Sequence, residues 1–203
     1  MPAASTSVLY GSSEGGHHST LFDRDLGTRP GSVGRVAPPG VVKLSPDGEI
    51  LYRSPTLMDG YFDRPEETAA ALDGGWYHTG DLATMDADGY IWITGRAREL
   101  IRTAGEWVAP VEVEQALSGL AGVSDLAVVG IPDAEWGEVV CVAVVAAPGG
   151  PEPTVEAVRG HLGERIASFK HPRRVVAVES IPRTPATGQV QRTLLRDLVG
   201  DKL

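Results

Sequence analysis

The first half of the chain alternates short apolar runs with turn residues, a pattern typical of antiparallel strands. The runs Val41–Leu44 and Glu49–Tyr52 are separated by Pro46-Asp47-Gly48, which predicts two strands joined by a turn. Two more strands are predicted within residues 75–95, on either side of Asp88-Gly89. This half therefore favours a small antiparallel sheet.

Residues 1–30 are small, polar and glycine-rich, and carry only a weak strand signal at Ser7–Tyr10. We expect a strand there that stops at Gly11 and has no earlier element to pair with. A short helix is predicted from Arg64 onward, with Asp63 as its N-cap and Glu66 three residues later.

The second half has longer apolar elements of both kinds. Pro110 can begin a helix, because its missing N–H is not needed in the first turn. Thr154 can cap a second helix, and we expect that helix to include Ile166. Three strands are predicted, at Ser124–Ile131, Val139–Ala146 and Val175–Val178, and helical spacing is seen at Val113, Ala116, Leu117 and Leu120, then at Val155, Val158, Leu162 and Ile166.

The change of pattern predicts an α+β protein with a boundary near Arg98. Residues 1–98 form the antiparallel part and residues 99–203 a small α+β domain. A tail rich in glycine and proline follows at Ile181–Gly188, and a basic helix is expected after it.

Composition narrows the classes of function. The chain has 203 residues, of which 42% are hydrophobic, enough for a packed core. A net charge of -9 argues against general nucleic-acid binding. No apolar stretch approaches the roughly 20 residues of a membrane span, and no secretory signal is seen at the N-terminus. The one cysteine, Cys141, lies in an apolar run and reads as a buried strand residue, which suits a cytoplasmic protein.

Five segments in a fixed order carry a family resemblance. They are Tyr10-Gly11-Ser12-Ser13-Glu14; Gly48-Glu49-Ile50 with Met58-Asp59-Gly60-Tyr61; Trp76-Tyr77-His78-Thr79-Gly80-Asp81; Gly89-Tyr90 through Gly95-Arg96 to Gly105, Pro110 and Glu112-Val113-Glu114; and Pro182-Arg183-Thr184-Pro185-Ala186-Thr187-Gly188-Gln189-Val190. Together they resemble the adenylate-forming superfamily of acyl-CoA synthetases, peptide-synthetase adenylation domains and luciferases, over nearly the whole chain.

The resemblance implies a nucleotide site in the first half. Asp81 would hold the two ribose hydroxyls of AMP or ATP, with Arg96 as a second ribose contact. Glu14 would be the Mg²⁺ carboxylate, since hard oxygen ligands suit a metal that bridges phosphates. Ser13 replaces the family's usual threonine and keeps a hydroxyl near phosphate. Tyr10 would stack beside the adenine.

For the second half, the resemblance implies a hinge and a path for CoA. Arg98 falls at the hinge position, where the family usually has aspartate or lysine. Gly105 would let pantetheine pass because it has no Cβ, and Trp107 replaces a small polar residue and could narrow that passage.

A surface for the CoA nucleotide is implied at Trp136, Phe169 and Arg173. From the residues alone, a turn tryptophan, a core phenylalanine and a solvated arginine explain these positions equally well.

Two departures from the family shape the expected function. Gln189 stands where the family has the lysine that assists adenylation, and the loss of such a contact typically costs roughly 10²–10³ in rate. The phosphate loop that precedes the Tyr10 segment in the family is also absent. We therefore expect the chain not to make acyl-adenylate alone.

Three interpretations remain open. In the first, the chain works in thioester formation, on acyl-adenylate and CoA, with a separate large domain or as a homo-oligomer. Alternatively, it is a catalytically degenerate binding or scaffold protein. In the third, it is a fragment of a full-length ligase.

Overall fold

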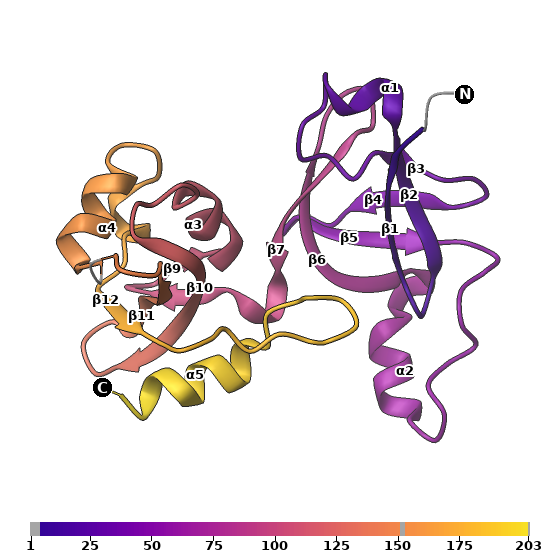
Figure 1. Ribbon diagram of the computed structural model, residues 1–203. Coiled ribbons are helices and arrows are strands. Elements are labelled where there is room, and N and C mark those ends of the chain that lie inside the picture. The colour runs from indigo at the N-terminus through magenta and orange to yellow at the C-terminus, as the bar shows by residue number, and fades with distance from the viewer. Residues whose placement is uncertain (1–4, 151–152, 203) are drawn as a thin grey trace. The chain divides into compact units, whose positions relative to one another are not determined.

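The computed structural model describes residues 5–150 and 153–202, which divide into two compact units on either side of the Ala97–Arg98 bond. The first unit runs to Ala97 and the second begins at Arg98 (Figure 1).

Among its described residues, the first unit contains two antiparallel sheets, two α-helices and a short 3₁₀ helix at Asp73–Gly75. One sheet has the order β1-β2-β3 and the other the order β4-β5-β6-β7. Their elements are β1 (Ser7–Ser12), β2 (Gly16–Phe22), α1 (Asp23–Leu26), β3 (Arg35–Val36), β4 (Val41–Leu44), β5 (Glu49–Arg53), α2 (Pro65–Ala71), β6 (Tyr77–Met85) and β7 (Ile91–Arg96).

A small apolar cluster joins these two sheets. Ile50, Ala83 and Ile91 are buried at its centre, and Tyr10 of β1 packs against them. Tyr10 thereby comes close to the middle of β6, although more than 60 residues separate them in sequence.

The second unit is a five-stranded sheet with helices on both faces (Figure 1). Four strands follow the order β10-β11-β8-β9, and β12 pairs in parallel with β11. The elements are β8 (Ile101–Thr103), β9 (Glu106–Val108), α3 (Pro110–Ala116), β10 (Val123–Asp133), β11 (Gly137–Ala146), α4 (Val155–Leu162), β12 (Arg174–Ala177) and α5 (Arg192–Gly200), with a short 3₁₀ helix at Ala97–Glu99 and another at Ser168–Lys170.

Side-chain alternation along β11 explains why helices cover both faces. Val140 and Val142 pack with residues of α3 and α4, such as Val113. Cys141 points the other way and packs with Leu195 of α5. A strand buried on both faces reads as a continuous apolar run, as the Val139–Ala146 sequence does.

The α+β fold class is confirmed, and several of the expected elements need correction. The strand at Tyr10 continues to Ser12 and pairs with β2, which the sequence pattern had not indicated. Helix α2 has Arg64 as its N-cap, while Asp63 lies at a left-handed φ of 54°. Helix α4 is capped by Thr154 as expected but ends at Leu162, because Gly163 takes φ 49°. Ile166 therefore lies outside it.

Candidate nucleotide and thioester site

Asp81 is a buried carboxylate on β6, with 6% of the residue exposed. Its backbone N–H donates to the Thr79 hydroxyl at 3.1 Å, and that hydroxyl donates to the Ile50 carbonyl at 2.8 Å. The adjacent Gly80 has φ 69° and donates its N–H to Glu49 at 2.8 Å. These bonds fix the backbone around Asp81, so the carboxylate is held in a defined orientation.

Both carboxylate oxygens of Asp81 are engaged by neighbouring strands. The Tyr10 hydroxyl donates to Oδ2 at 2.6 Å, and Arg96 Nε lies 2.7 Å from Oδ1. Arg96 lies directly opposite Asp81 in the β6–β7 ladder. Burial raises the pKa of the Tyr10 hydroxyl far above its ordinary value, and the hydrogen bond to Asp81 raises it further. Tyr10 therefore stays protonated and donates.

The contacts with Tyr10 and Arg96 make Asp81 a buried anion of fixed orientation. A carboxylate accepts charge-assisted hydrogen bonds of the kind that a pair of neighbouring hydroxyls donates. The structure thus brings together three of the expected site residues, Tyr10, Asp81 and Arg96.

Glu14 lies in the turn between β1 and β2, where its Oε1 accepts a hydrogen bond from the Tyr61 hydroxyl at 2.9 Å. Partial burial opposes ionisation, but hydrogen bonds from Tyr61 and from its own backbone N–H hold the pKa of Glu14 below the ordinary value. An ionised, half-buried carboxylate fits one ligand of a hard cation. The described residues contain no group of three or more His, Cys, Asp or Glu side chains that could hold a metal together. Ser13 is exposed beside it.

His18 is a buried residue near this site whose environment the sequence did not reveal. It is 0% exposed and is surrounded by the rings of Tyr52, Tyr10 and Tyr77 at 4.1, 5.2 and 6.0 Å between centroids. Its Nε2 lies 3.3 Å from the Ser12 hydroxyl, and its Nδ1 has no hydrogen-bond partner among the described residues. Burial lowers the pKa of His18 to about 4, so the ring is neutral.

In the second unit, Gly105 lies at the tip of the β8–β9 hairpin. Ala104 and Gly105 have φ values of 52° and 86°, the two left-handed residues of a tight hairpin turn. A Cβ at Gly105 would meet no atom within 4 Å, so the space beside it is open. Trp107 is exposed on the solvent face of the hairpin, with the Arg102 guanidinium 5.5 Å from its ring centre. Arg98 is exposed in the 3₁₀ helix at Ala97–Glu99.

Trp136 and Arg173 form a cation–π pair next to the turn of this hairpin. The Arg173 guanidinium carbon lies 3.8 Å from the centre of the Trp136 ring. The Trp136 carbonyl accepts a hydrogen bond from the N–H of Ala104 at 3.0 Å, which links this cation–π pair to the turn that carries Gly105. Phe169 is 42% exposed, so it is not a core residue, and the Lys170 ammonium lies 5.7 Å from the centre of its ring.

Gln189 lies in a hairpin formed by residues 182–191, called the tail hairpin below. Thr184 and Gly188 each donate a backbone N–H across it at 2.8 Å, to the carbonyls of Gln189 and Thr184 respectively. The N–H of Gln191 donates to the Pro182 carbonyl at 2.8 Å and closes its base. Gln189 is exposed and directly follows the turn.

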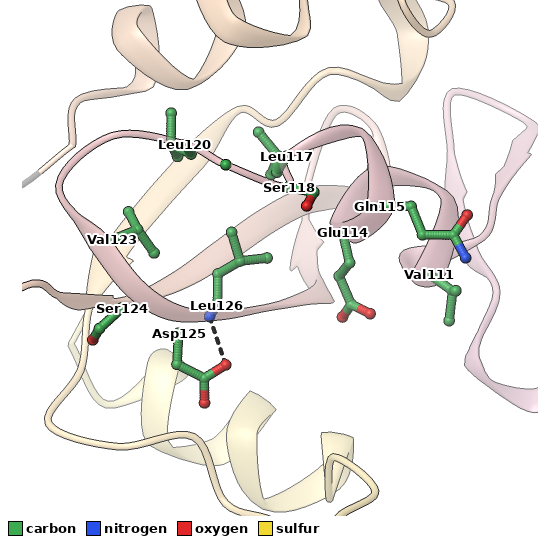
Figure 2. Close-up of a pocket in the computed structure, with 11 residues that line it drawn as sticks. Val111, Glu114, Gln115, Leu117, Ser118, Leu120, Val123, Ser124, Asp125 and Leu126 are labelled. Carbon is green, nitrogen blue, oxygen red and sulfur yellow. Dashed lines mark hydrogen bonds between the residues drawn. The ribbon is translucent and has the colours of Figure 1, made fainter. Parts of the chain in front are cut away.

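A shallow groove of about 610 Å³ lies beside α3 and the start of β10 (Figure 2). Its lining includes the apolar side chains of Leu117, Val123 and Leu126. In Figure 2 the carboxylates of Glu114 and Asp125 point away from these apolar side chains. Both carboxylates are paired with arginines, Glu114 with Arg192 and Asp125 with Arg183, so they are not available ligands in the groove.

Comparison with known proteins gives the family. Residues 112–187 match the family model described as AMP-binding enzyme C-terminal domain. The long-chain-fatty-acid–CoA ligase FadD13 of Mycobacterium tuberculosis H37Rv is 36% identical over 191 residues, which is 90% of this chain and 37% of the relative.

Solved structures agree with this match. ATP-bound MatB from Rhodopseudomonas palustris has a TM-score of 0.86 at 32% identity, covering 97% of this chain and 41% of that one. MenE, the o-succinylbenzoate–CoA synthetase of Bacillus subtilis solved with ATP and a magnesium ion, has a TM-score of 0.83 at 28% identity, covering 95% and 42%. The architecture is thus that of the C-terminal part of adenylate-forming enzymes.

In sequence and in fold the chain corresponds to the C-terminal region of acyl-CoA ligases of the adenylate-forming type. It spans 37% of the length of the curated relative described above. Among the described residues, no helix is long and apolar enough to cross a membrane.

Proposed function

We propose that this chain takes part in the thioester-forming step of a carboxylic acid–CoA ligase, in which CoA attacks an acyl-adenylate. The observation that carries the proposal is the buried Asp81 carboxylate, held by Tyr10 at 2.6 Å and Arg96 at 2.7 Å. We assign Asp81 and Arg96 to the ribose of the adenylate. Because both groups are fixed before a ligand arrives, little reorganisation is needed to bind it.

The reaction needs only the acyl-adenylate and CoA. The thiolate sulfur of CoA attacks the acyl carbonyl carbon, so a C–S bond forms. The bond between that carbon and the phosphate oxygen breaks, and AMP leaves with the electron pair. The thiol proton goes to solvent. The chain's contribution is to hold the nucleotide and guide the thiol, and positioning of this kind supplies much of the rate in such reactions.

The second unit supplies the proposed route for CoA. The open space beside Gly105 suits the thin pantetheine arm. The Trp136–Arg173 pair offers an aromatic face and a positive charge for the nucleotide end, with Phe169 exposed on the same unit. Arg98 would be the hinge about which the second unit turns between an adenylating and a thioester-forming pose. Glu14 would contribute one oxygen ligand to Mg²⁺ when phosphates bring the metal to the site.

Gln189 limits the proposal to this half-reaction. A glutamine brings no charge to the phosphate during adenylation, but thioester formation needs none there because pyrophosphate has already left. The adenine-stacking role of Tyr10 remains part of the proposal, beside its hydrogen bond to Asp81. The acyl pocket and the rest of the adenine site would come from a large domain. A cytoplasmic location completes the proposal, in keeping with the buried free thiol of Cys141.

The test combines the full chain with the complementary large-domain segment of a relative, synthetic acyl-adenylate and CoA, and measures acyl-CoA by mass spectrometry. Asp81→Ala should lower the rate about 10-fold or more, the loss of a charge-assisted contact. Gln189→Lys should leave it nearly unchanged and serves as the matched control. A strong increase with Gln189→Lys would contradict the separation of the two half-reactions.

A catalytically degenerate binding protein is the second candidate, and Gln189 is the observation that favours it. The two candidates differ in one result. A degenerate protein would bind the acyl-adenylate through Asp81 but would form no acyl-CoA with any large domain.

A further inference from the structure

The side chain of Arg192 connects three separate segments of the second unit. Its Nε lies 2.7 Å from Glu99 Oε2, and its Nη1 lies 2.6 Å from Glu114 Oε1 and 2.8 Å from the Val128 carbonyl. Nη2 lies 3.2 Å from the second oxygen of Glu114. Only 13% of the Arg192 side chain is exposed. One planar guanidinium thus satisfies four hydrogen bonds to three partners, a geometry that lysine cannot reproduce.

Arg192 and Glu99 lie near opposite ends of the second unit's sequence. Arg192 is the first residue of α5 and directly follows the tail hairpin. Glu99 is the residue after Arg98 and ends the 3₁₀ helix at Ala97–Glu99. The two are 93 residues apart in sequence. The Arg192–Glu99 pair therefore ties the base of the tail hairpin to the first residues of the second unit.

A second arginine holds the hairpin at its other strand. Arg183 pairs with Asp125 of β10 at 2.8 Å and donates to the Gly188 carbonyl at 3.0 Å. Arg183 is more exposed, with 39% of its side chain accessible, so water screens this pair more strongly. The anchor at Arg192 is the more buried of the two and the one that reaches Glu99.

We propose that Arg192 is a positioning residue that makes the tail hairpin and the segment at Glu99 a single rigid body, so that any movement about Arg98 carries the Gln189 hairpin with it. Only the hinge role of Arg98 rests on the proposed function. The rigid link itself rests on the contacts of Arg192. A change at Glu99 should therefore loosen the hairpin, although the two do not touch directly.

The experiment measures amide hydrogen exchange by NMR in the full chain, at Thr184, Gly188 and Gln191, whose N–H groups hold the hairpin together. Glu99→Ala should speed exchange at these three amides about 10-fold or more, the order expected for losing one charge-assisted hydrogen bond. Arg192→Lys should speed exchange at least as much, because it also disturbs the bonds to Glu114 and the Val128 carbonyl. Adding Glu99→Ala to Arg192→Lys should add little, because the link to Glu99 is already broken in that variant.

Two controls separate positioning from general loss of stability. Glu112 lies on α3, the helix that also carries Glu114, and its carboxylate oxygens are 2.6 and 2.7 Å from the Lys170 ammonium. Glu112→Ala removes this ion pair and should leave exchange at the hairpin amides unchanged. Amides in the middle of β11 should keep their protection in Glu99→Ala. The proposal is wrong if Glu99→Ala leaves the hairpin amides unchanged, or if β11 loses protection to the same extent. Neither result bears on the ribose role of Asp81, which the thioester assay tests separately.

Discussion

Lowering the pH below 6.5 should destabilise the first unit through one buried imidazole. Burial lowers the pKa of His18 from 6.5 to about 4, and the charge of Glu14 only partly opposes this. In the unfolded chain the ring takes up a proton near its ordinary pKa. Between the two values the unfolded state therefore binds more protons than the folded state, so stability is present at neutral pH and is lost as the pH falls.

The size of the effect follows from the two pKa values. The gap between 6.5 and about 4 corresponds to about 3 kcal/mol when fully expressed, at about 1.4 kcal/mol for each pKa unit. At pH 5 the same values give a loss of about 2 kcal/mol. This is a large fraction of the stability of an ordinary domain, which is roughly 5–15 kcal/mol.

The assay is urea unfolding at several pH values between 7 and 4.5, followed by tryptophan fluorescence. The first unit contributes Trp76 and Trp92 to that signal. Replacing His18 with leucine removes the titrating group from the core, so the variant should lose less stability on acidification than the parent chain. Equal slopes for the parent chain and His18→Leu would refute the reasoning.

Two further predictions concern the second unit. Ala104 adopts φ 52°, and Ala104→Gly should raise stability by about 0.5–1 kcal/mol, since the left-handed cost of about 1–2 kcal/mol exceeds the entropy cost of glycine. The matched change Gly105→Ala, at φ 86°, should lower stability by about 1 kcal/mol, both shown by urea midpoints. The Thr154 hydroxyl accepts from the N–H of Ala157 at 3.2 Å, so Thr154→Ala should cost about 1 kcal/mol in thermal unfolding, and an unchanged melting temperature would show that the cap contributes nothing.

Sequence patterns predicted best those elements whose apolar residues stand out from polar flanking residues. The strand at Ser124–Ile131 stands out because its buried side chains are apolar. In the strand at Val41–Leu44, Val42 and Leu44 are partly buried and pack against an apolar cluster. Strand β2 was missed because two of its three buried residues are polar, and only Leu21 is apolar. His18 and Ser19 are both 0% exposed, and the Ser19 hydroxyl is satisfied by the Val33 carbonyl at 2.7 Å. A buried polar residue with a partner resembles a loop residue in the sequence, and only the fold supplies the partner.

The candidate site shows a similar division. The motif singled out Asp81 and Arg96, and their adjacency follows from strand pairing that local patterns predict. The bond from Tyr10 to Asp81 spans 71 residues and depends on how two sheets pack, which no local pattern contains. Arg192 was read simply as part of a basic helix, because its partners Glu99 and Glu114 are distant in sequence.

The side chain of Gln189 can be changed without touching the ion pairs that hold its hairpin. The hairpin that presents it is held by Arg183 on Asp125 and by Arg192 on Glu99 and Glu114, all outside residue 189. The Gln189 backbone joins the hairpin through its carbonyl, which accepts from Thr184, and its side chain is exposed. A lysine there would bring a charge without changing any of these anchors. Any effect of Gln189→Lys on rate would therefore report the electrostatics of the reacting phosphate and not a rearranged hairpin, which is why the same substitution can separate the two half-reactions.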